Sequence, residues 1–178
     1  GWAYTLVSTR ENRIASIEIT NQRLAVRETT GDLHIQTNHY VTPEMQSANL
    51  ELNASVTEDS IARMTRVREL SEQRVGTLSP QEAINILSDK WDPVNQEVRG
   101  LGNVVAVHTT LSSSVFDPSN HKVFVASGLA PVSLSPYIEL PLIEDFNSET
   151  FSSAPYSIKE NSKYFTQYPH LAKAEQLY

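Results

Sequence analysis

The chain has 178 residues, no cysteine, and 14 basic against 21 acidic side chains, which gives a formal net charge of −7. This length indicates one domain with a sizeable core, and the lack of cysteine excludes disulfide scaffolds, thiolate zinc sites and a cysteine nucleophile within these residues. The acidic balance argues against a nucleic-acid partner and an anionic membrane surface, and no apolar run approaches the roughly 20 residues of a membrane span.

The first part of the chain alternates polar and apolar residues, which indicates a meander of short antiparallel strands. Strands are expected at about residues 3–9, 13–20, 23–29 and 32–37. Turn-forming residues separate them: Asn12, Asn21 with Gln22, and Gly31. Because residues 1–7 are already strand-like, we expect truncation or cleavage rather than a natural beginning at this point.

A polar loop is expected from residue 38 to residue 55, and loops of this length are often functional. Two helices should follow. Thr57 is the expected N-cap of the first helix. Apolar residues then recur in it at helical spacing: Ile61, Met64, Val67 and Leu70. The second helix is better marked, because Ser79 can cap it, Pro80 takes the first helical position and Glu82 completes a capping box.

The remainder of the chain returns to strands. They are expected at residues 103–109, 112–116 and 122–127, with a turn at Asp117-Pro118-Ser119-Asn120. The proline-rich stretch from residue 131 to residue 141 is expected to be extended or to form an edge strand, and residues 171–178 are compatible with a short helix. Strands, then two helices, then strands predict an α+β fold with antiparallel sheets and flanking helices.

Common catalytic signatures do not occur in the sequence. It contains no P-loop, no GxGxxG, no HExxH and no GxSxG. The five histidines show no metal-ligand spacing. We therefore expect neither a metal nor a cofactor.

Three features rise above this background, and one of them, the acidic set Glu139, Glu144 and Asp145, is expected to be a solvated edge. The other two bear on a binding site. Residues 37–40, Thr-Asn-His-Tyr, place polar groups where a predicted strand meets a loop, which suits a ligand site but also an ordinary strand-ending turn. Arg63 lies at the border of the apolar face of the first helix. Its stem can be buried there with the guanidinium directed at an anion, although a solvated helix edge fits the same spacing.

These features belong to an ordered series of motifs. The series is Thr37-Asn38-His39-Tyr40, Ser60-x-x-Arg63, residues 113–118 (Ser-Ser-Val-Phe-Asp-Pro) and residues 123–128 (Val-Phe-Val-Ala-Ser-Gly). It resembles the acyl-coenzyme A:6-aminopenicillanic acid acyltransferase family and, more distantly, the choloylglycine hydrolases and penicillin V acylases. All are N-terminal-nucleophile (Ntn) hydrolases with a cysteine nucleophile. The resemblance covers about residues 3–133 and rests on order and spacing, since no single motif would suffice.

The resemblance implies a particular α+β architecture, the αββα sandwich, in which two antiparallel sheets lie between helical layers. Residues 1–145 would then form the C-terminal portion of an Ntn-hydrolase domain, and residues 146–178 an extended tail with a short helix. It also implies attack on an amide carbonyl by an N-terminal cysteine, with the free α-amine of that cysteine as the base.

Roles for four residues follow from the resemblance. Asn38 corresponds to the asparagine at a strand end that helps form the oxyanion hole, and its NH₂ would point at the tetrahedral oxygen. Arg63 corresponds to the arginine of the helix after that loop, which would lie near the nucleophile. His39 and Tyr40 would shape the substrate pocket.

The departure from the family pattern concerns the nucleophile, since residue 1 is glycine and no cysteine occurs. We therefore expect a fragment or subunit of a linear-amide hydrolase or acyltransferase that acts on a small-molecule amide or acyl substrate. A missing N-terminal segment or a separate chain would supply the cysteine. The alternative is a catalytically inactive protein of the same fold that binds acyl or amide compounds. A third hypothesis, a generic α+β interaction domain, applies only if the match in motif spacing is a coincidence.

Overall fold

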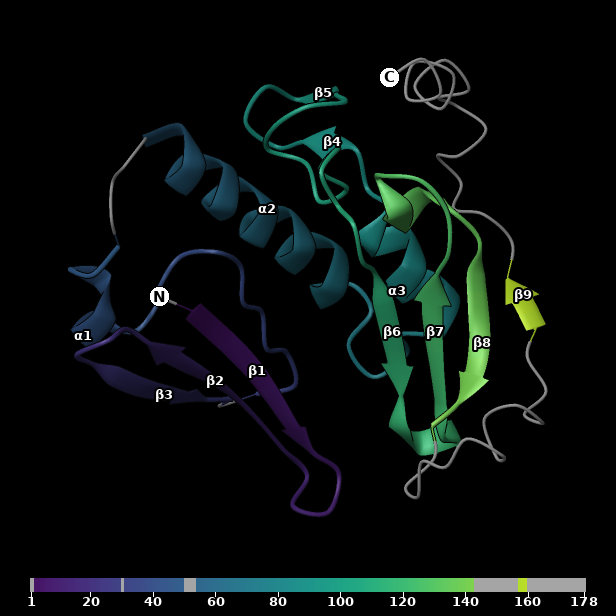
Figure 1. The fold of residues 1–178 in the computed structure, drawn as a ribbon, viewed down its shortest axis with the longest axis horizontal. Helices are drawn as coiled ribbons and strands as arrows, with labels where there is room; N and C mark the ends of the chain where they lie inside the picture. Colours follow the sequence, from purple (N-terminus) through teal and green to yellow (C-terminus); the bar gives the residue numbers. More distant parts are fainter. Residues whose placement is uncertain (1, 30, 50–53, 143–156, 160–178) are drawn as a thin grey trace. The chain divides into compact units, whose positions relative to one another are not determined.

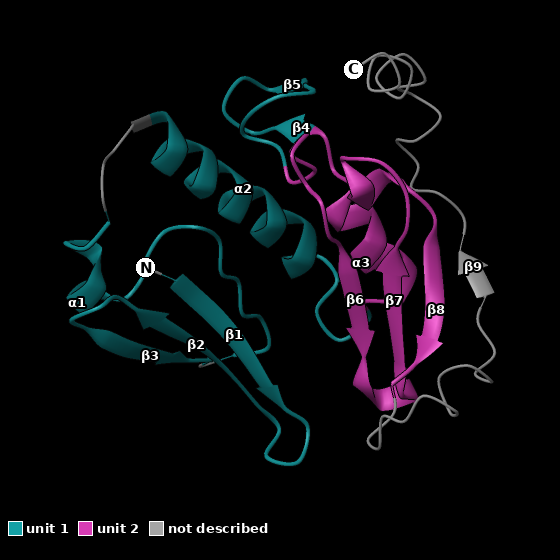
Figure 2. Ribbon diagram, viewed as in Figure 1, with its two compact units in different colours: residues 1–77, 91–104 teal, residues 78–90, 105–178 magenta. Residues whose placement is uncertain are grey.

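The computed structural model describes residues 2–29, 31–49, 54–142 and 157–159. The chain divides into two compact units, which are coloured separately in Figure 2. Unit 1 consists of residues 1–77 and 91–104, and unit 2 consists of residues 78–90 and 105–178. Each unit is described by itself below.

Unit 1 begins with a three-stranded antiparallel sheet in the order β1-β2-β3 (Figure 1). The strands are β1 (Trp2–Ser8), β2 (Arg13–Ile19) and β3 (Leu24–Glu28), so the first three predicted strands are confirmed. Asn12 forms the turn between β1 and β2 with a φ of 50°, a left-handed conformation that asparagine tolerates. The unit continues with α1 (Pro43–Gln46), α2 (Ala54–Glu72) and a short hairpin of β4 (Trp91–Asp92) and β5 (Glu97–Val98).

The sheet of unit 1 buries its polar face. Ser16 and Glu18 on β2 are fully buried, whereas Trp2 and Tyr4 on β1 are more than half exposed. Leu6, Leu24 and Val26 are exposed to a similar extent. The pairing of Tyr4 with Ile17 and of Ile17 with Val26 places these apolar residues on one face. The opposite face, which carries Glu18, is therefore the one that the following loop covers.

The predicted strand at residues 32–37 is wrong, because this segment has no strand pairing. Side chains take the hydrogen bonds that a strand ladder would use. Arg27 of β3 donates to the carbonyl oxygen of Ile35 and to Gln36 Oε1, both at 2.8 Å. His34 contacts Ser16 Oγ at 2.7 Å through Nε2. The segment therefore lies over the buried polar face as an irregular loop.

The first long helix begins earlier than predicted. α2 starts at Ala54, so Thr57 lies inside its first turn and is not the N-cap. A threonine is compatible with both positions, and cap residues alone leave a helix start open by a few residues. Ile61 is 48% exposed, whereas Ser60, Ala62 and Met64 are buried. The covered side of α2 thus includes the small polar residue Ser60.

Unit 2 contains the second predicted helix, α3 (Pro80–Leu87), with the capping box that the sequence predicts. Its four-stranded antiparallel sheet has the order β6 (Ser114–Asp117), β7 (Lys122–Ala126), β8 (Tyr137–Pro141) and β9 (Ser157–Lys159). Ile84 of α3 packs on Phe124 and Tyr137 in the core of this unit. The predicted turn at residues 117–120 is confirmed, and the Asp117 carboxylate accepts the Asn120 N–H.

One prediction for the later part of the chain is wrong, and another is confirmed in part. Residues 103–109 form no strand, because Gly102 and Asn103 have φ values of 69° and 56° and break the extended conformation. The proline-rich stretch contains an extended segment, β8, as the sequence predicts; because β8 pairs with strands on both sides, it is not an edge strand. Pro141 is tolerated there as the last residue of the strand. The predicted helix at 171–178 and two members of the acidic set lie outside the described residues.

The secondary structure of the described residues is thus α+β, with three α-helices and three small antiparallel sheets, as the sequence predicts at that level. None of the helices in this part of the chain has both the length and the apolar character to cross a membrane.

Candidate functional site

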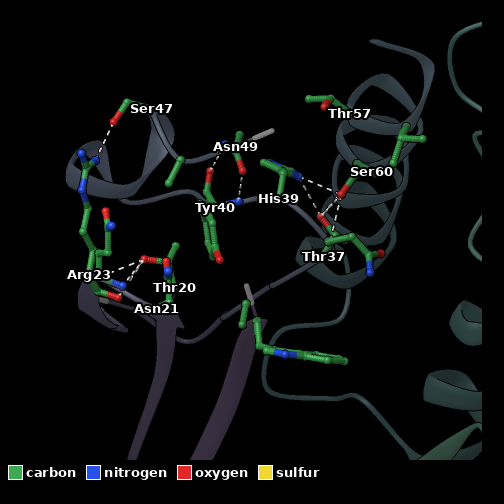
Figure 3. A pocket seen from close by; sticks show the side chains of 16 residues that line it. Thr20, Asn21, Arg23, Thr37, His39, Tyr40, Ser47, Asn49, Thr57 and Ser60 are labelled. Carbon is green, nitrogen blue, oxygen red and sulfur yellow. Dashed lines mark hydrogen bonds between the residues drawn. The ribbon is translucent and has the colours of Figure 1, made fainter. Parts of the chain in front are cut away.

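A pocket opens in unit 1 beside residues 37–40 (Figure 3). Its volume is about 720 Å³, and it is lined by the start of β1, the turn between β2 and β3, segments 37–40 and 47–49, and the first two turns of α2. Small-molecule sites typically have volumes of about 300–1,000 Å³. Asn38, His39 and Tyr40 line the pocket. Arg63 is not a lining residue, but it contacts one of them, Asn38.

The side chain of Asn38 is oriented by Arg63. Arg63 Nη2 donates to Asn38 Oδ1 at 2.8 Å. Because a guanidinium only donates, the atom that faces Arg63 is the amide oxygen, and the NH₂ group points elsewhere. That NH₂ has no hydrogen-bond partner among the described residues, and Asn38 is exposed. The positive charge on the oxygen end also polarises the amide, which makes the NH₂ a stronger donor.

The backbone of the same segment is fixed by Ser60 of α2. The Ser60 hydroxyl is buried and accepts the Asn38 N–H at 2.9 Å. It donates to Thr37 Oγ1 at 3.0 Å, and Thr37 Oγ1 in turn donates to the Ser60 carbonyl oxygen at 3.1 Å. Figure 3 shows this cluster beside the labelled His39. Ser60 and Arg63, three residues apart on one helix, therefore hold the main chain and the side chain of Asn38.

His39 completes this cluster. Its Nδ1 lies 2.8 Å from Ser60 Oγ. Since the single proton of that hydroxyl goes to Thr37, Nδ1 carries a proton and Nε2 is left as the acceptor. Burial lowers the pKa of His39; the charge of Glu18 opposes this and the charge of Arg63 adds to it. The imidazole is therefore neutral at neutral pH.

Tyr40 is buried, and its polar groups are used within the protein. The hydroxyl donates to the carbonyl oxygen of Ile19 at 2.7 Å. Its backbone N–H donates to Asn49 Oδ1, and its carbonyl oxygen accepts from Asn49 Nδ2. Of the side chain, only the ring is left to contact a ligand in the pocket, so any binding role of Tyr40 is one of shape.

Sequence reasoning missed Glu18, which anchors the chain directly after Tyr40. The Glu18 carboxylate is fully buried. It accepts the Val41 N–H at 2.7 Å, the Thr42 N–H at 3.1 Å and the Thr42 hydroxyl at 2.7 Å. The one available signal was the alternation in β2, which places Ser16 and Glu18 on the same face. That pattern does not say which face of the sheet is covered.

The described side chains that line the pocket include hydrogen-bond donors and one positive charge, but no negative charge. The lining includes Arg23 and His39 but no aspartate or glutamate among the described residues. Arg23 is held by a hydrogen bond from Nη1 to Ser47 Oγ at 2.8 Å (Figure 3). No group of three or more histidine, aspartate or glutamate side chains that could hold a metal ion occurs in the part of the chain that the structure describes. Such a site can donate hydrogen bonds to a polarised or anionic oxygen.

Comparison with known proteins identifies one family. A family model described as acyl-coenzyme A:6-aminopenicillanic acid acyl-transferase matches residues 1–129. Neither the curated proteins nor the solved structures that were compared gave a match. The matched range covers well over half of the chain and includes every candidate site residue. The chain therefore belongs to the acyl-coenzyme A:6-aminopenicillanic acid acyl-transferase family.

Proposed function

We propose that this chain is part of an Ntn-type hydrolase or acyltransferase that acts on linear amides, and that Asn38 and Arg63 form its oxyanion-binding side. The observation that carries this proposal is the orientation of the Asn38 amide. Arg63 holds the amide oxygen and Ser60 holds the backbone N–H, so the side-chain NH₂ is left as an oriented donor at the pocket. A preorganised donor of this kind stabilises the charge that develops on a carbonyl oxygen during acyl transfer.

In the proposed reaction, the thiolate of an N-terminal cysteine attacks the amide carbonyl carbon. A C–S bond forms, and the carbonyl electron pair moves to the oxygen, where the Asn38 NH₂ donates to it. As the C–N bond breaks, the leaving amine takes the proton that the cysteine α-amine received from the thiol. Water or an acceptor amine then attacks the thioester carbonyl carbon, so that a C–O or C–N bond forms and the C–S bond breaks. The attacking group passes its proton through the α-amine to the departing thiolate, and the acyl group leaves as a carboxylic acid or a new amide. These 178 residues contain no cysteine, so the proposal requires one from a separate segment or chain.

We also propose that the β1–β3 sheet and the β6–β9 sheet are inner layers of an αββα sandwich. The β1–β3 sheet has an exposed apolar face, and the β6–β9 sheet exposes one large apolar side chain. Unit 1 exposes Trp2 and Tyr4, and unit 2 exposes Phe116, which is 63% accessible on the side of β6 away from the core residue Phe124. Open apolar faces of this kind are what a second packed layer covers.

The test is amide hydrolysis by the full-length protein that carries the nucleophile. Replacing Asn38 by alanine removes the proposed oxyanion donor, and we expect kcat to fall by about 10²–10³-fold, the usual effect of losing one such donor. Asn85→Ala is the matched control, because it removes the same amide group from α3 in unit 2.

Two outcomes would contradict the proposal. If the Asn38→Ala protein keeps the kcat of the unchanged enzyme, Asn38 is not the oxyanion donor. If the full-length protein binds acyl or amide compounds at this pocket but shows no turnover of them, the catalytically inactive binding protein is the correct alternative.

A further inference from the structure

We propose that Asp59 is a positioning residue that holds Arg63, and through it the Asn38 amide, in the orientation that catalysis requires. The proposal rests on the function proposed above and adds a residue that acts without touching the substrate. It is based on a continuous set of hydrogen bonds within unit 1.

Asp59 and Asn38 each accept a hydrogen bond from the Arg63 guanidinium. Asp59 Oδ2 accepts from Arg63 Nε at 2.8 Å, and Asn38 Oδ1 accepts from Arg63 Nη2 at 2.8 Å. The guanidinium is planar, so its donors have fixed directions relative to one another. When Asp59 fixes Nε, it also fixes the direction in which Nη2 points. The side chains of Asp59 and Arg63 are 23% and 18% exposed, so solvent competes only in part.

Asp59 is itself held by the segment that follows the β4–β5 hairpin. Asp59 Oδ1 accepts the backbone N–H of Asn103 at 2.6 Å. The side chain of Asn103 donates to Asp92 Oδ2 at 3.2 Å, and Asp92 also binds Arg99 at 2.9 Å. Both oxygens of Asp59 are therefore used, one for Arg63 and one for this segment. The result is a connected path that runs from Asp92 to Asn38.

An ordinary helix ion pair would not have these properties. Asp59 and Arg63 are four residues apart on α2, and such pairs stabilise a helix slightly wherever they occur. The same helix provides a comparison, because Arg66 and Glu69 form a pair at 3.3 Å in which Glu69 is 48% exposed. Among the described residues, the hydrogen bonds of Asn38 are with Ser60 and Arg63 and not with this pair. The comparison therefore separates helix stabilisation from positioning.

The experiment measures kcat and KM of the full-length enzyme with Asp59→Asn, with the control Glu69→Gln, and with Asp59→Asn in an Arg63→Ala background. Asparagine has one oxygen, so it can satisfy either Arg63 or the Asn103 N–H but not both. We expect Asp59→Asn to lower kcat by about 10-fold to 100-fold with little change in KM, as expected for a misplaced catalytic group. In the Arg63→Ala background, we expect the same change to lower kcat by less than about 2-fold, because residues in one network are not additive.

A second measurement needs no activity. In this chain, the NMR signals of the Arg63 Nε–H and the Asn38 side-chain NH₂ should both move in Asp59→Asn and stay in place in Glu69→Gln. Unmoved signals in Asp59→Asn overturn the proposal. So does a kcat equal to that of the Glu69→Gln control, or an equal loss in both Arg63 backgrounds.

Failure of this proposal can be distinguished from failure of the proposed function. If Asn38→Ala lowers kcat and Asp59→Asn does not, only the positioning role is wrong. If Asn38→Ala has no effect on kcat, the oxyanion assignment fails, and the role of Asp59 fails with it.

Discussion

The buried carboxylate of Glu18 holds the backbone directly after the site residue Tyr40. Replacing Glu18 by alanine tests how much this anchor contributes to stability. The mutation removes the acceptor of three hydrogen bonds, from the Val41 N–H, the Thr42 N–H and the Thr42 hydroxyl. Thr42 is 6% exposed, so its N–H stays buried without a partner, whereas the half-buried Val41 can be rehydrated in part.

The expected loss of stability follows from these contacts. A buried donor left without a partner costs about 1–3 kcal/mol, and hydrogen bonds to a charged group lie toward the upper end of that range. Two donors that stay buried and one that is partly rehydrated give about 4 kcal/mol. Glu18→Gln keeps one oxygen acceptor, and the expected loss is about 2 kcal/mol.

Urea unfolding followed by tryptophan fluorescence measures this loss. The chain has two tryptophans, Trp2 and Trp91, and both belong to unit 1, so the signal reports on the unit that contains Glu18. With a slope of about 2 kcal/mol per molar urea, Glu18→Ala should lower the midpoint by about 2 M. Glu28→Gln is the control, because it breaks an exposed ion pair with Arg13 on the same sheet, and such pairs contribute at most about 1 kcal/mol. Equal midpoints for Glu18→Ala and Glu28→Gln would refute the reasoning.

Three further predictions use the same unfolding assay, NMR or circular dichroism. Burial opposes ionisation of Asp92, but hydrogen bonds from Asn95, Arg99 and Val94 outweigh it and hold the pKa of Asp92 well below its usual value. The ionised Asp92 therefore adds to the free energy of unfolding. This contribution is complete above about pH 4 and is lost at lower pH, because the carboxyl group then takes up a proton in the unfolded chain. The stability difference between the unchanged protein and Asp92→Asn should therefore be about 1 kcal/mol smaller at pH 3 than at pH 7, and an equal difference at both values would contradict this. Burial and the Arg63 charge lower the pKa of His39, so an NMR titration of His39 should give a midpoint below the ordinary value of about 6.5. Arg63→Gln should raise this midpoint. Because the folded protein binds the proton less tightly than the unfolded chain, unit 1 should lose stability as the pH falls and His39 is protonated. In unit 2, a Cβ at Gly128 would overlap the Ser135 side chain, so Gly128→Ala should lower the thermal midpoint measured by circular dichroism, and adding Ser135→Gly should restore it.

The sequence predicted the elements whose signals are local. The alternation of β1 to β3, the capping box of α3 and the Asp-Pro turn after β6 all depend on residues close together in the chain, and all three occur in the structure. The strand predicted at 32–37 failed for a non-local reason. Arg27 and Ser16, both outside that segment, bind its carbonyl and side-chain groups and keep it as a loop. Alternation cannot report such competition, because the competing groups lie elsewhere in the sequence.

The candidate site was predictable only in part for the same reason. Asn38 and Arg63 were identified through a family pattern, and the structure brings them into contact. Glu18 and Asn103 carried no such pattern, since a glutamate in a strand and an asparagine in a loop are usually solvated. Their importance depends on what approaches them in three dimensions, namely the Thr42 N–H for Glu18 and the Asp59 carboxylate for the backbone of Asn103.

The spacing of Ser60 and Arg63 explains why one helix can control the orientation of an amide on a neighbouring loop. Residues three apart on an α-helix lie on the same side, about one turn from each other. Ser60 therefore meets the backbone N–H of Asn38 while Arg63 meets its side-chain oxygen. Two contacts to one residue, from two points of a rigid helix, leave the amide little freedom to rotate. The Ser-x-x-Arg motif thus fixes the orientation of the Asn38 amide. Under the function proposed above, the oxyanion donor is therefore in place before any substrate arrives.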